Sequence, residues 1–508
     1  MLSTFNNHAC LTSGDSSLDA DQRNIRMTCS EKKEQRLRLL VAIASYGSKN
    51  LDFLKRIIRR YQNLPMDVDV VVFSEVSKDL GQTVKVFIGL PSSNPRSLPF
   101  THKSYFAENI ERYDLFVYSE DDIEVTEKNI QAFLRITPQL KSDEIAGYLR
   151  YEMDQSKTMT LPDIHGAFHW KAESVRRRGA EIIAEFTNEH AGFYILTQAQ
   201  LRQAIASGGF LVDPCEGRYG MLETAATDPY TSCGFRKVIC ISNLKDFFVH
   251  HMSNRYTGQV GVLLPVLEEQ IKTLTDICDD KHPASSLFNL ESKILHGRWS
   301  KSYYEKPAEE LLKMVPANAK TVLSIGCGWG ATEMVLKQRG AEVTALPLDS
   351  VIGVATARLG IEVIYGSWEE CQRKLDGRKF DCVLMADLLH LLPSPGEILQ
   401  QCTQFVEKNG TLVVGGPNLG RISTLIQRAF GRGDYWKLRD FVESGISVYG
   451  PKALAEDITS AGLHIVAVRW LNHEVNWNYL RGSRINFGRL TARDWVLQAR
   501  PTASDQQL

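Results

Sequence analysis

The feature that most constrains the fold of this chain is an alternation of strand-like and helix-like segments that occurs twice. In the first half, the aliphatic run "RLRLLVAIASYG" precedes a segment with helical spacing, whose apolar side chains share one face: Leu51, Leu54, Ile57, Ile58 and Tyr61. The strand-like runs "DVDVVVFSEV" and "DLFVYSEDD" follow, with the helix-like "HKSYFAENIERY" between them. Strands that alternate with helices predict a parallel α/β sheet that is covered on both faces.

The alternation starts again near residue 320, where the run "KTVLSIGCGWG" ends in glycines and leads into the helix-like "ATEMVLKQRG". Further strand-like runs follow, and "GLHIVAVRWL" and "RDWVLQARP" have the pattern of a closing pair. The sequence therefore predicts two doubly wound α/β domains, at 37–258 and 297–501, joined by a helical linker at 259–296. The polar ends, 1–36 and 502–508, are predicted to be a disordered lead-in and a tail.

Charge and cysteine usage exclude several classes of protein. The formal net charge of the 508 residues is -1, which predicts no partner among the nucleic acids. The ten cysteines form no CxxC pair, which favours reduced thiols and a cytoplasmic location. No apolar run reaches the length of about 18 residues that a spanning helix needs, and the N-terminus lacks the apolar centre of a signal peptide.

Three adjacent acids, Glu120, Asp121 and Asp122, follow the apolar run "LFVYS". In a parallel α/β sheet, ligands bind beyond the carboxyl ends of the strands. Carboxylates so close together repel one another unless water or a cation neutralises them, and Mg²⁺ and Mn²⁺ prefer oxygen ligands. The pattern therefore predicts a site for a divalent cation and a diphosphate. The alternative is a solvated acidic loop or a helix N-terminus, because "SEDDIEVTEKNIQAFL" also has the pattern of a helix entry.

Residues 37–258 resemble the GT-A class of nucleotide-sugar glycosyltransferases, in which an acidic motif ends the strand after the nucleotide-binding half. The resemblance implies a GT-A fold, a Mn²⁺ or Mg²⁺ ion on Asp122, and a nucleotide-diphosphate sugar as donor. The other residues implied to lie near the nucleotide or its phosphates are Ser45, Tyr46, Glu75, Lys103, Glu120 and Asp121.

The acceptor side of the same resemblance concerns the base that deprotonates an attacking hydroxyl. In many inverting GT-A enzymes this carboxylate precedes a "glycine-aromatic-basic" triplet, which points to Glu223 here. Thr224 replaces the second acid of the usual pair, so Glu216 and Asp228 stay as alternatives. A glycan or glycolipid is the implied acceptor, and a lipid-linked one would bring the protein to a membrane surface.

A late histidine completes the metal site in several GT-A families, and "DFFVHHMSNRY" contains two. Either His250 or His251 is implied as a ligand, and only one of these strand neighbours can point inward. The alternative for each is a partly buried strand histidine with an ordinary hydrogen bond.

A glycine-rich turn opens the second half, where "VLSIGCGWGATEMVL" joins a strand to a helix through Gly326, Cys327, Gly328 and Gly330. Glycines allow a tight turn and a close approach of a ligand, and the helix N-terminus adds free N–H groups. The run resembles the first motif of class I S-adenosylmethionine-dependent methyltransferases, and "FDCVLMADLLHLLPSP" resembles their fourth-strand motif. The resemblance, over 297–501, implies a Rossmann-like fold and S-adenosylmethionine as cofactor, rather than the NAD that a glycine motif alone also permits.

Two positions depart from that family's pattern. Pro347 stands where an acid normally binds the cofactor ribose, so Asp349, two residues on, is the substitute candidate. Ser367 replaces an acid after the third strand, and the neighbouring Trp368 is a candidate for stacking on adenine or for ordinary packing.

The fourth-strand motif supplies the remaining candidates of the second half. Asp387 is a candidate for the cofactor side of the site or for a structural role. His390 is the candidate base for methyl transfer to a hydroxyl, or else a loop histidine packed on the next helix.

The two resemblances together predict a bifunctional enzyme of cell-surface glycan synthesis, which transfers a sugar and methylates a glycan hydroxyl. Two alternatives keep only one activity: a methyltransferase with a non-catalytic sugar-recognition module, or a glycosyltransferase with a degenerate methyltransferase scaffold. An NAD-linked oxidoreductase fits the fourth-strand motif poorly.

Overall fold

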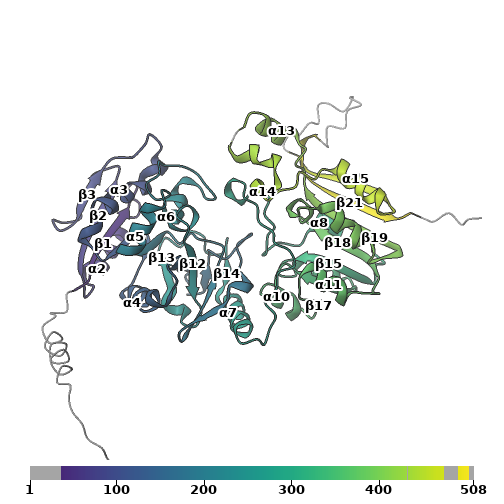
Figure 1. Ribbon diagram of the computed structural model, residues 1–508, viewed down its shortest axis with the longest axis horizontal. Coiled ribbons are helices and arrows are strands. Elements are labelled where there is room, and N and C mark those ends of the chain that lie inside the picture. Colours follow the sequence, from purple (N-terminus) through teal and green to yellow (C-terminus); the bar gives the residue numbers. More distant parts are fainter. Residues whose placement is uncertain (1–35, 432, 474–489, 503–508) are drawn as a thin grey trace, which may run out of the picture.

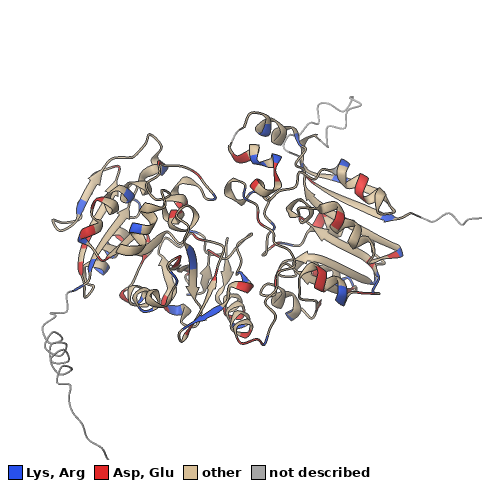
Figure 2. Ribbon diagram, viewed as in Figure 1, with Lys and Arg blue, Asp and Glu red and all other residues tan. Residues whose placement is uncertain are grey.

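The computed structural model describes residues 36–431, 433–473 and 490–502, and shows two lobes (Figure 1). The predicted lead-in, apart from residue 36, and the end of the predicted tail lie outside the described residues. Figure 2 shows acidic and basic residues interspersed over both lobes, in keeping with the net charge of -1. No helix in the described ranges is long and apolar enough to cross a membrane, and the cysteines within them are free thiols.

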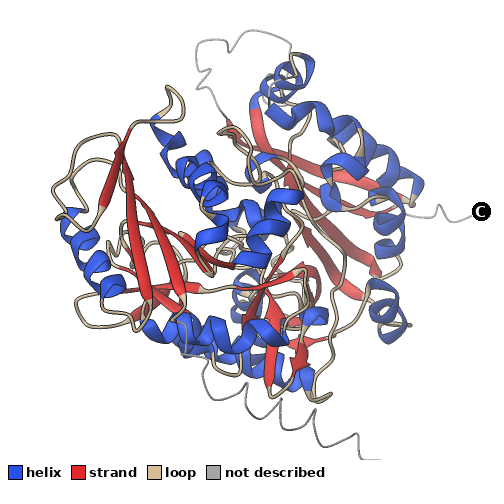
Figure 3. Cartoon of the chain, turned by 60° about the vertical axis from the view of Figure 1, so that its left-hand side comes forward, coloured by secondary structure: helices blue, strands red, loops and turns tan. Residues whose placement is uncertain are grey.

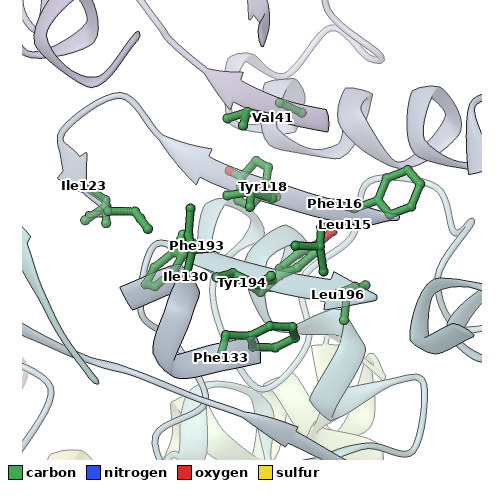
Figure 4. Packing of buried hydrophobic residues seen from close by; sticks show 14 of the residues in the cluster. Val41, Leu115, Phe116, Tyr118, Ile123, Ile130, Phe133, Phe193, Tyr194 and Leu196 are labelled. Carbon is green, nitrogen blue, oxygen red and sulfur yellow. The ribbon is translucent and has the colours of Figure 1, made fainter. Parts of the chain in front are cut away.

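The first lobe contains a five-stranded sheet in the order β11-β4-β1-β2-β3. The strands β1, β2, β3 and β4 are parallel, and β11 runs antiparallel to β4. The elements are β1 (Arg38–Ala44), β2 (Asp67–Ser74), β3 (Lys85–Ile88), β4 (Leu115–Glu120), β11 (Phe193–Thr197), α2 (Leu51–Gln62) and α3 (Thr101–Glu108). Figure 4 shows Tyr118 of β4 and Tyr194 of β11 within the buried cluster of this sheet.

Two further sheets of this lobe were not predicted from the sequence. One has the order β6-β12-β10-β9 and the other β14-β8-β7-β13-β5, both with antiparallel pairs. Their strands are β5 (Ile123–Glu124), β6 (Glu144–Ala146), β7 (Leu149–Met153), β8 (Met159–Leu161), β9 (Arg176–Arg178), β10 (Glu181–Glu185), β12 (Arg236–Cys240), β13 (Phe248–His251) and β14 (Val262–Leu263). The helices are α4 (Glu127–Ile136), α5 (Gln198–Ala206) and α6 (Met221–Thr231). Strands this short carry too little alternation to be recognised along the chain.

The predicted helical linker begins with α7 (Leu264–Cys278), which packs on the first lobe. The indole N–H of the buried Trp170 donates to the Gln270 side-chain oxygen of α7 at 3.1 Å. After α7 the chain has little regular secondary structure up to residue 308, and Leu287 packs into the core of the second lobe.

The described residues of the second lobe form a seven-stranded sheet in the order β17-β16-β15-β18-β19-β21-β20. Its strands are β15 (Thr321–Cys327), β16 (Glu342–Pro347), β17 (Glu362–Val363), β18 (Phe380–Ala386), β19 (Val406–Pro417), β20 (Leu463–His473) and β21 (Ala492–Pro501). The five strands β15 to β19 are parallel to one another. Strand β21 runs antiparallel to both β19 and β20, which confirms that the last two strands form the predicted closing pair.

Helices cover this sheet on both faces, as Figure 3 shows. They are α8 (Glu309–Leu312), α9 (Ala331–Gln338), α10 (Gly353–Arg358), α11 (Trp368–Lys374), α12 (Pro395–Thr403), α13 (Ile422–Ala429), α14 (Phe441–Ser444) and α15 (Pro451–Ser460). The expectation of an α/β class with a Rossmann-like second domain is therefore confirmed. A cavity of about 1470 Å³ lies between the lobes and is lined by residues of both, including Lys237, Glu189, Trp368 and Glu397.

Candidate functional site

The acids that end β4 are buried at the carboxyl edge of the first sheet. Asp121 is 7% exposed, and its carboxylate accepts hydrogen bonds from Ser45 Oγ at 2.6 Å and Asn50 Nδ2 at 2.8 Å. Ser45 follows β1, the strand that pairs with β4, so the parallel register brings the two residues together. Burial raises the pKa of Asp121 to about 6, although these hydrogen bonds oppose the rise.

Asp122 faces a histidine of β13. His251 Nε2 lies 3.2 Å from Asp122 Oδ2, and His251 Nδ1 lies 2.6 Å from Glu152 Oε1. Burial raises the pKa of Asp122, but the hydrogen bond and charge of His251 outweigh burial and hold the pKa below its usual value. An aspartate at 8% exposure with this partner is not a solvated loop acid.

His250 points to the other face of β13, because successive side chains of a strand alternate. Its ring stacks on Tyr151 at 4.8 Å, and its Nδ1 lies 3.9 Å from Glu124 Oε2. Of the two alternatives, the structure leaves His251 as the candidate metal ligand, because His250 faces away from Asp122.

Glu120 is half-buried, and burial raises its pKa to about 8 with help from the negative charge of Asp122. The charge of Glu223, in the first turn of α6, acts in the same direction, so this candidate base lies on the same side of the domain as the acids. Glu216 Oε2 lies 3.9 Å from Nε2 of His296 in the linker, and the same histidine lies near Glu223 beside Gly220, so Glu216 stays an alternative base.

Lys103 and Asp228 form a buried ion pair, which changes the interpretation of both. Their side chains are 3% and 1% exposed, and the Lys103 ammonium also lies 4.2 Å from the centre of the Phe100 ring. A paired, enclosed ammonium does not present itself to a diphosphate, and a carboxylate so paired is a poor proton acceptor. The structure therefore contradicts the predicted donor contact of Lys103 and the alternative of Asp228 as the base.

The other donor-side candidates lie near the end of β1. Glu75 Oε1 accepts a hydrogen bond from the Gly47 N–H at 2.7 Å, which ties the end of β2 to the loop after β1. Tyr46, in the same loop, is 56% exposed. Glu75 and Tyr46 therefore lie near the Ser45–Asp121 pair, where they could contact a ligand.

No group of three or more His, Cys, Asp or Glu placed to hold a metal is present among the described residues. Asp122 and His251 supply one carboxylate and one imidazole. Mg²⁺ and similar ions in phosphate-transfer sites take one or two carboxylates from the protein and the rest from water and substrate phosphates. The donor set therefore fits a cation shared with a diphosphate, and does not form a closed protein cage.

The glycine turn of the second domain has the predicted geometry. Gly326 and Gly330 have φ values of 75° and 88°, which side chains disfavour, and Gly330 precedes α9. A Cβ on Gly328 would lie 2.3 Å from the Tyr303 carbonyl oxygen. Cys327, 2% exposed, belongs to the core beneath the turn.

Pro347 and Asp349, the residues predicted for the nucleoside end of the cofactor site, lie at the end of β16 and two residues beyond it. Asp349 is 2% exposed, and its Oδ1 accepts hydrogen bonds from the N–H groups of Val351 and Ile352, both at 2.8 Å. Its Oδ2 is buried without a hydrogen-bond partner. Burial raises the pKa of Asp349 to about 7.

Trp368, at 3% exposure, begins α11 and donates from its indole to Gln401 Oε1 at 2.6 Å. Ser367 caps the same helix through a bond from the Glu370 N–H at 3.3 Å. The indole is covered by Phe288 of the linker, with ring centres 5.6 Å apart. In the described conformation, Tyr303 packs against the glycine turn, and Leu287 of the linker is hydrogen-bonded to Leu348 and Trp368.

The remaining candidates lie in the loop after β18. Asp387 is exposed and has a φ of 49°. His390 is 4% exposed, and its Nε2 lies 2.7 Å from the Trp299 carbonyl oxygen, while its Nδ1 has no partner. Burial lowers the pKa of His390, so its ring is neutral at physiological pH, as a proton acceptor requires.

Sequence reasoning missed Asn50, Glu152 and the linker residues at the cofactor site. Asn50 contacts Asp121 and Glu152 contacts His251 only in the tertiary structure, and nothing in the local sequence singles them out. The apolar pair Leu287–Phe288 inside a polar linker was a signal that the linker packs against something.

Comparison with known proteins concerns the second domain. Residues 299–468 match the model of a family described as a methyltransferase domain. A ubiquinone biosynthesis O-methyltransferase of Xylella fastidiosa (strain 9a5c) is 27% identical over 177 residues, which are 32% of this chain and 68% of that protein. One of Pseudomonas paraeruginosa (strain DSM 24068 / PA7) is 31% identical over 106 residues, which are 20% of this chain and 45% of that protein.

Among solved structures, an S-adenosylmethionine-dependent methyltransferase from Archaeoglobus fulgidus aligns over 38% of this chain and 90% of its own, at 16% identity and a TM-score of 0.30. The family match and the relatives agree with the glycine turn and the sheet order described above. Residues 299–468 therefore form a class I S-adenosylmethionine-dependent methyltransferase domain.

Proposed function

We propose that this protein methylates a hydroxyl of a sugar-containing substrate, and that its N-terminal domain binds a nucleotide-diphosphate sugar. The family match and the O-methyltransferase relatives support the methyl-transfer half. The sugar half rests on the geometry of the N-terminal domain alone.

The observation that carries the sugar half is the buried acidic cluster at the edge of the first sheet. Asp121 is oriented by Ser45 and Asn50, and Asp122 by His251. Acids held in this way cost free energy unless a ligand uses them, and a cation with a diphosphate is the ligand whose chemistry matches. Asp122 and His251 would hold the cation, which supplies positive charge against a leaving diphosphate.

The sheet order of this domain, with one antiparallel strand beside β4, is compatible with a GT-A fold. In the proposal, Glu75 and Tyr46 meet the nucleoside, and Glu223 accepts the proton of the attacking hydroxyl. Displacement by that oxygen would invert the anomeric carbon. His390 is the residue that would accept the proton of the hydroxyl to be methylated.

The N-terminal domain has two possible roles, which are transfer of the sugar and recognition of a sugar without transfer. The full chain would be screened with nucleotide sugars by thermal shift, with and without Mn²⁺, and then assayed for Mn²⁺-dependent hydrolysis of the donor. Asp122→Ala is expected to lower donor hydrolysis by about 100-fold or more, since it removes the charge that holds the cation. The matched control is Asp154→Ala, an exposed loop acid of the same domain.

The outcomes separate the two roles. Turnover that Asp122→Ala abolishes supports sugar transfer. A Mn²⁺-dependent shift without turnover supports the recognition role and a methyltransferase as the working enzyme. No shift with any nucleotide sugar contradicts the sugar half of the proposal.

A further inference from the structure

The place of the cofactor's nucleoside in the second domain follows from its topology. In doubly wound sheets a nucleotide binds beyond the carboxyl ends of the strands, with its ribose near an acid about 20 residues past the glycine turn. In this domain that place is the turn after β16, where Leu348, Asp349 and Ser350 stand. Trp368 forms the opposite wall, at the start of α11.

Residues 285–288 of the linker, here called the linker strand, run through this place. The Ser350 N–H donates to the Ser285 carbonyl at 2.9 Å, and the Leu287 N–H donates to the Leu348 carbonyl at 2.9 Å. Ser286 and Asp349 are opposite each other in an antiparallel bridge. The linker strand thus adds a short antiparallel strand to the segment that follows β16.

The linker strand also contacts the opposite wall. The backbone N–H of Trp368 donates to the Leu287 carbonyl at 3.1 Å, so the linker strand is hydrogen-bonded to both walls. The Leu287 side chain is 3% exposed and belongs to the same hydrophobic cluster as Trp368, Leu348 and Ile352. Phe288 covers the indole face on which a base would stack.

The glycine turn is covered by the chain as well. The backbone N–H of Trp329 donates to the Tyr303 carbonyl at 3.0 Å. A Cβ atom on Gly328 would lie 2.3 Å from the same carbonyl oxygen. The Tyr303 N–H donates in turn to the Gly166 carbonyl of the first lobe at 2.7 Å, and the Tyr303 ring stacks on His169 at 4.1 Å. The N-terminal domain therefore contacts Tyr303, the residue that covers the glycine turn.

A buried carboxyl group lies beside the linker strand. Asp349 Oδ2 has no hydrogen-bond partner at normal distance, although the Tyr303 hydroxyl interacts with the Asp349 carboxyl group and lowers its pKa. An acceptor left unsatisfied in such a place is costly, and a ribose hydroxyl is a donor that would satisfy it.

We propose that the linker strand occupies the nucleoside end of the methyltransferase cofactor site and must leave before S-adenosylmethionine or S-adenosylhomocysteine binds. The proposal rests on the methyltransferase domain and is independent of the sugar chemistry of the first domain. The apparent affinity for the cofactor is then the intrinsic affinity reduced by the fraction of molecules in which the linker strand has left.

The test is calorimetric titration of the full chain with S-adenosylhomocysteine. Leu287→Ser removes the buried side chain of the linker strand, and Phe288→Ala removes a partly exposed ring whose loss the fold tolerates better. Each is expected to tighten binding by about ten-fold or more, because the docked linker strand competes less well. Leu295→Ser is the matched control, since this residue lies in the same linker outside the contacts with residues 348–350 and 368, and its affinity is expected to equal that of the wild type.

Hydrogen exchange on the wild-type chain gives a second readout that does not depend on any variant. Saturating S-adenosylhomocysteine is expected to speed exchange at the amides of Leu287, Ser350 and Trp368, whose bonds hold the linker strand. Binding with these amides still protected overturns the proposal. So does equal affinity in the wild type, Leu287→Ser and Phe288→Ala. Absence of binding in all three up to millimolar ligand also overturns it, since the site is then lost rather than covered.

Discussion

Replacing Lys103 tests whether its ion pair with Asp228 is structural. The two groups are almost fully buried, and burial lowers the pKa of Lys103 and raises that of Asp228 despite their mutual attraction. Desolvation therefore exceeds the attraction, as expected for enclosed pairs. Lys103→Met leaves an unpaired buried carboxylate and is expected to lower the free energy of unfolding by about 3–5 kcal/mol.

The double variant Lys103→Met/Asp228→Asn separates loss of the pair from loss of the cation alone. Asparagine keeps a hydrogen-bond acceptor for Ser232 Oγ, which lies 3.1 Å from Asp228 Oδ1. With no charge left unpaired, the double variant is expected to lie within about 1–2 kcal/mol of the wild type. The control Lys55→Met, on the exposed face of α2, is expected to change stability by less than about 0.5 kcal/mol.

Urea unfolding of the wild type and the three variants, read by fluorescence and by circular dichroism, compares their free energies of unfolding. A Lys103→Met variant that is as stable as the wild type, yet no longer binds a nucleotide sugar that the wild type binds, would refute the structural assignment. Lys103 would then be the diphosphate contact that the sequence resemblance implied.

Three further predictions concern single sites. Gly328→Ala puts a methyl group 2.3 Å from the Tyr303 carbonyl oxygen and should lower stability by about 1–3 kcal/mol in thermal unfolding; an unchanged melting temperature would contradict the close approach. Because burial raises the pKa of Asp349 from 3.8 to about 7, the native state keeps a proton that the unfolded chain has lost. Stability should therefore fall by about 3 kcal/mol between pH 4 and 7, and Asp349→Asn should remove this slope in urea midpoints measured against pH. Thr126→Ala, which removes the capping box of α4, should cost about 1 kcal/mol, against less than about 0.5 kcal/mol for the exposed Gln131→Ala of the same helix.

Much of the second domain could be predicted because its strands and helices are long enough to show their period. The strands β15, β16 and β18 and the closing pair β20–β21 lie where the apolar runs predicted them. The short strands of the first lobe could not be predicted, because a two-residue strand such as β5 has no period. Their place is decided by partners distant in the chain.

The candidate sites divide in the same way. The acids after β4 and the glycines after β15 could be recognised because strand ends carry the ligand sites of α/β sheets. The choice of His251 over His250 needed only the direction of β13, which the alternation of the strand left open. The partner of Lys103 lies 125 residues further along the chain, so no local pattern could show that its charge is already neutralised.

What the sequence determined by itself is the periodicity of its elements and the residue types at their ends, because these depend on neighbours along the chain. What only the tertiary structure decided is which group meets each buried polar atom, and what covers each binding surface. The linker strand illustrates the difference: its apolar residues predict burial, but the free energy of burying them is gained only at a surface that the folded methyltransferase domain provides.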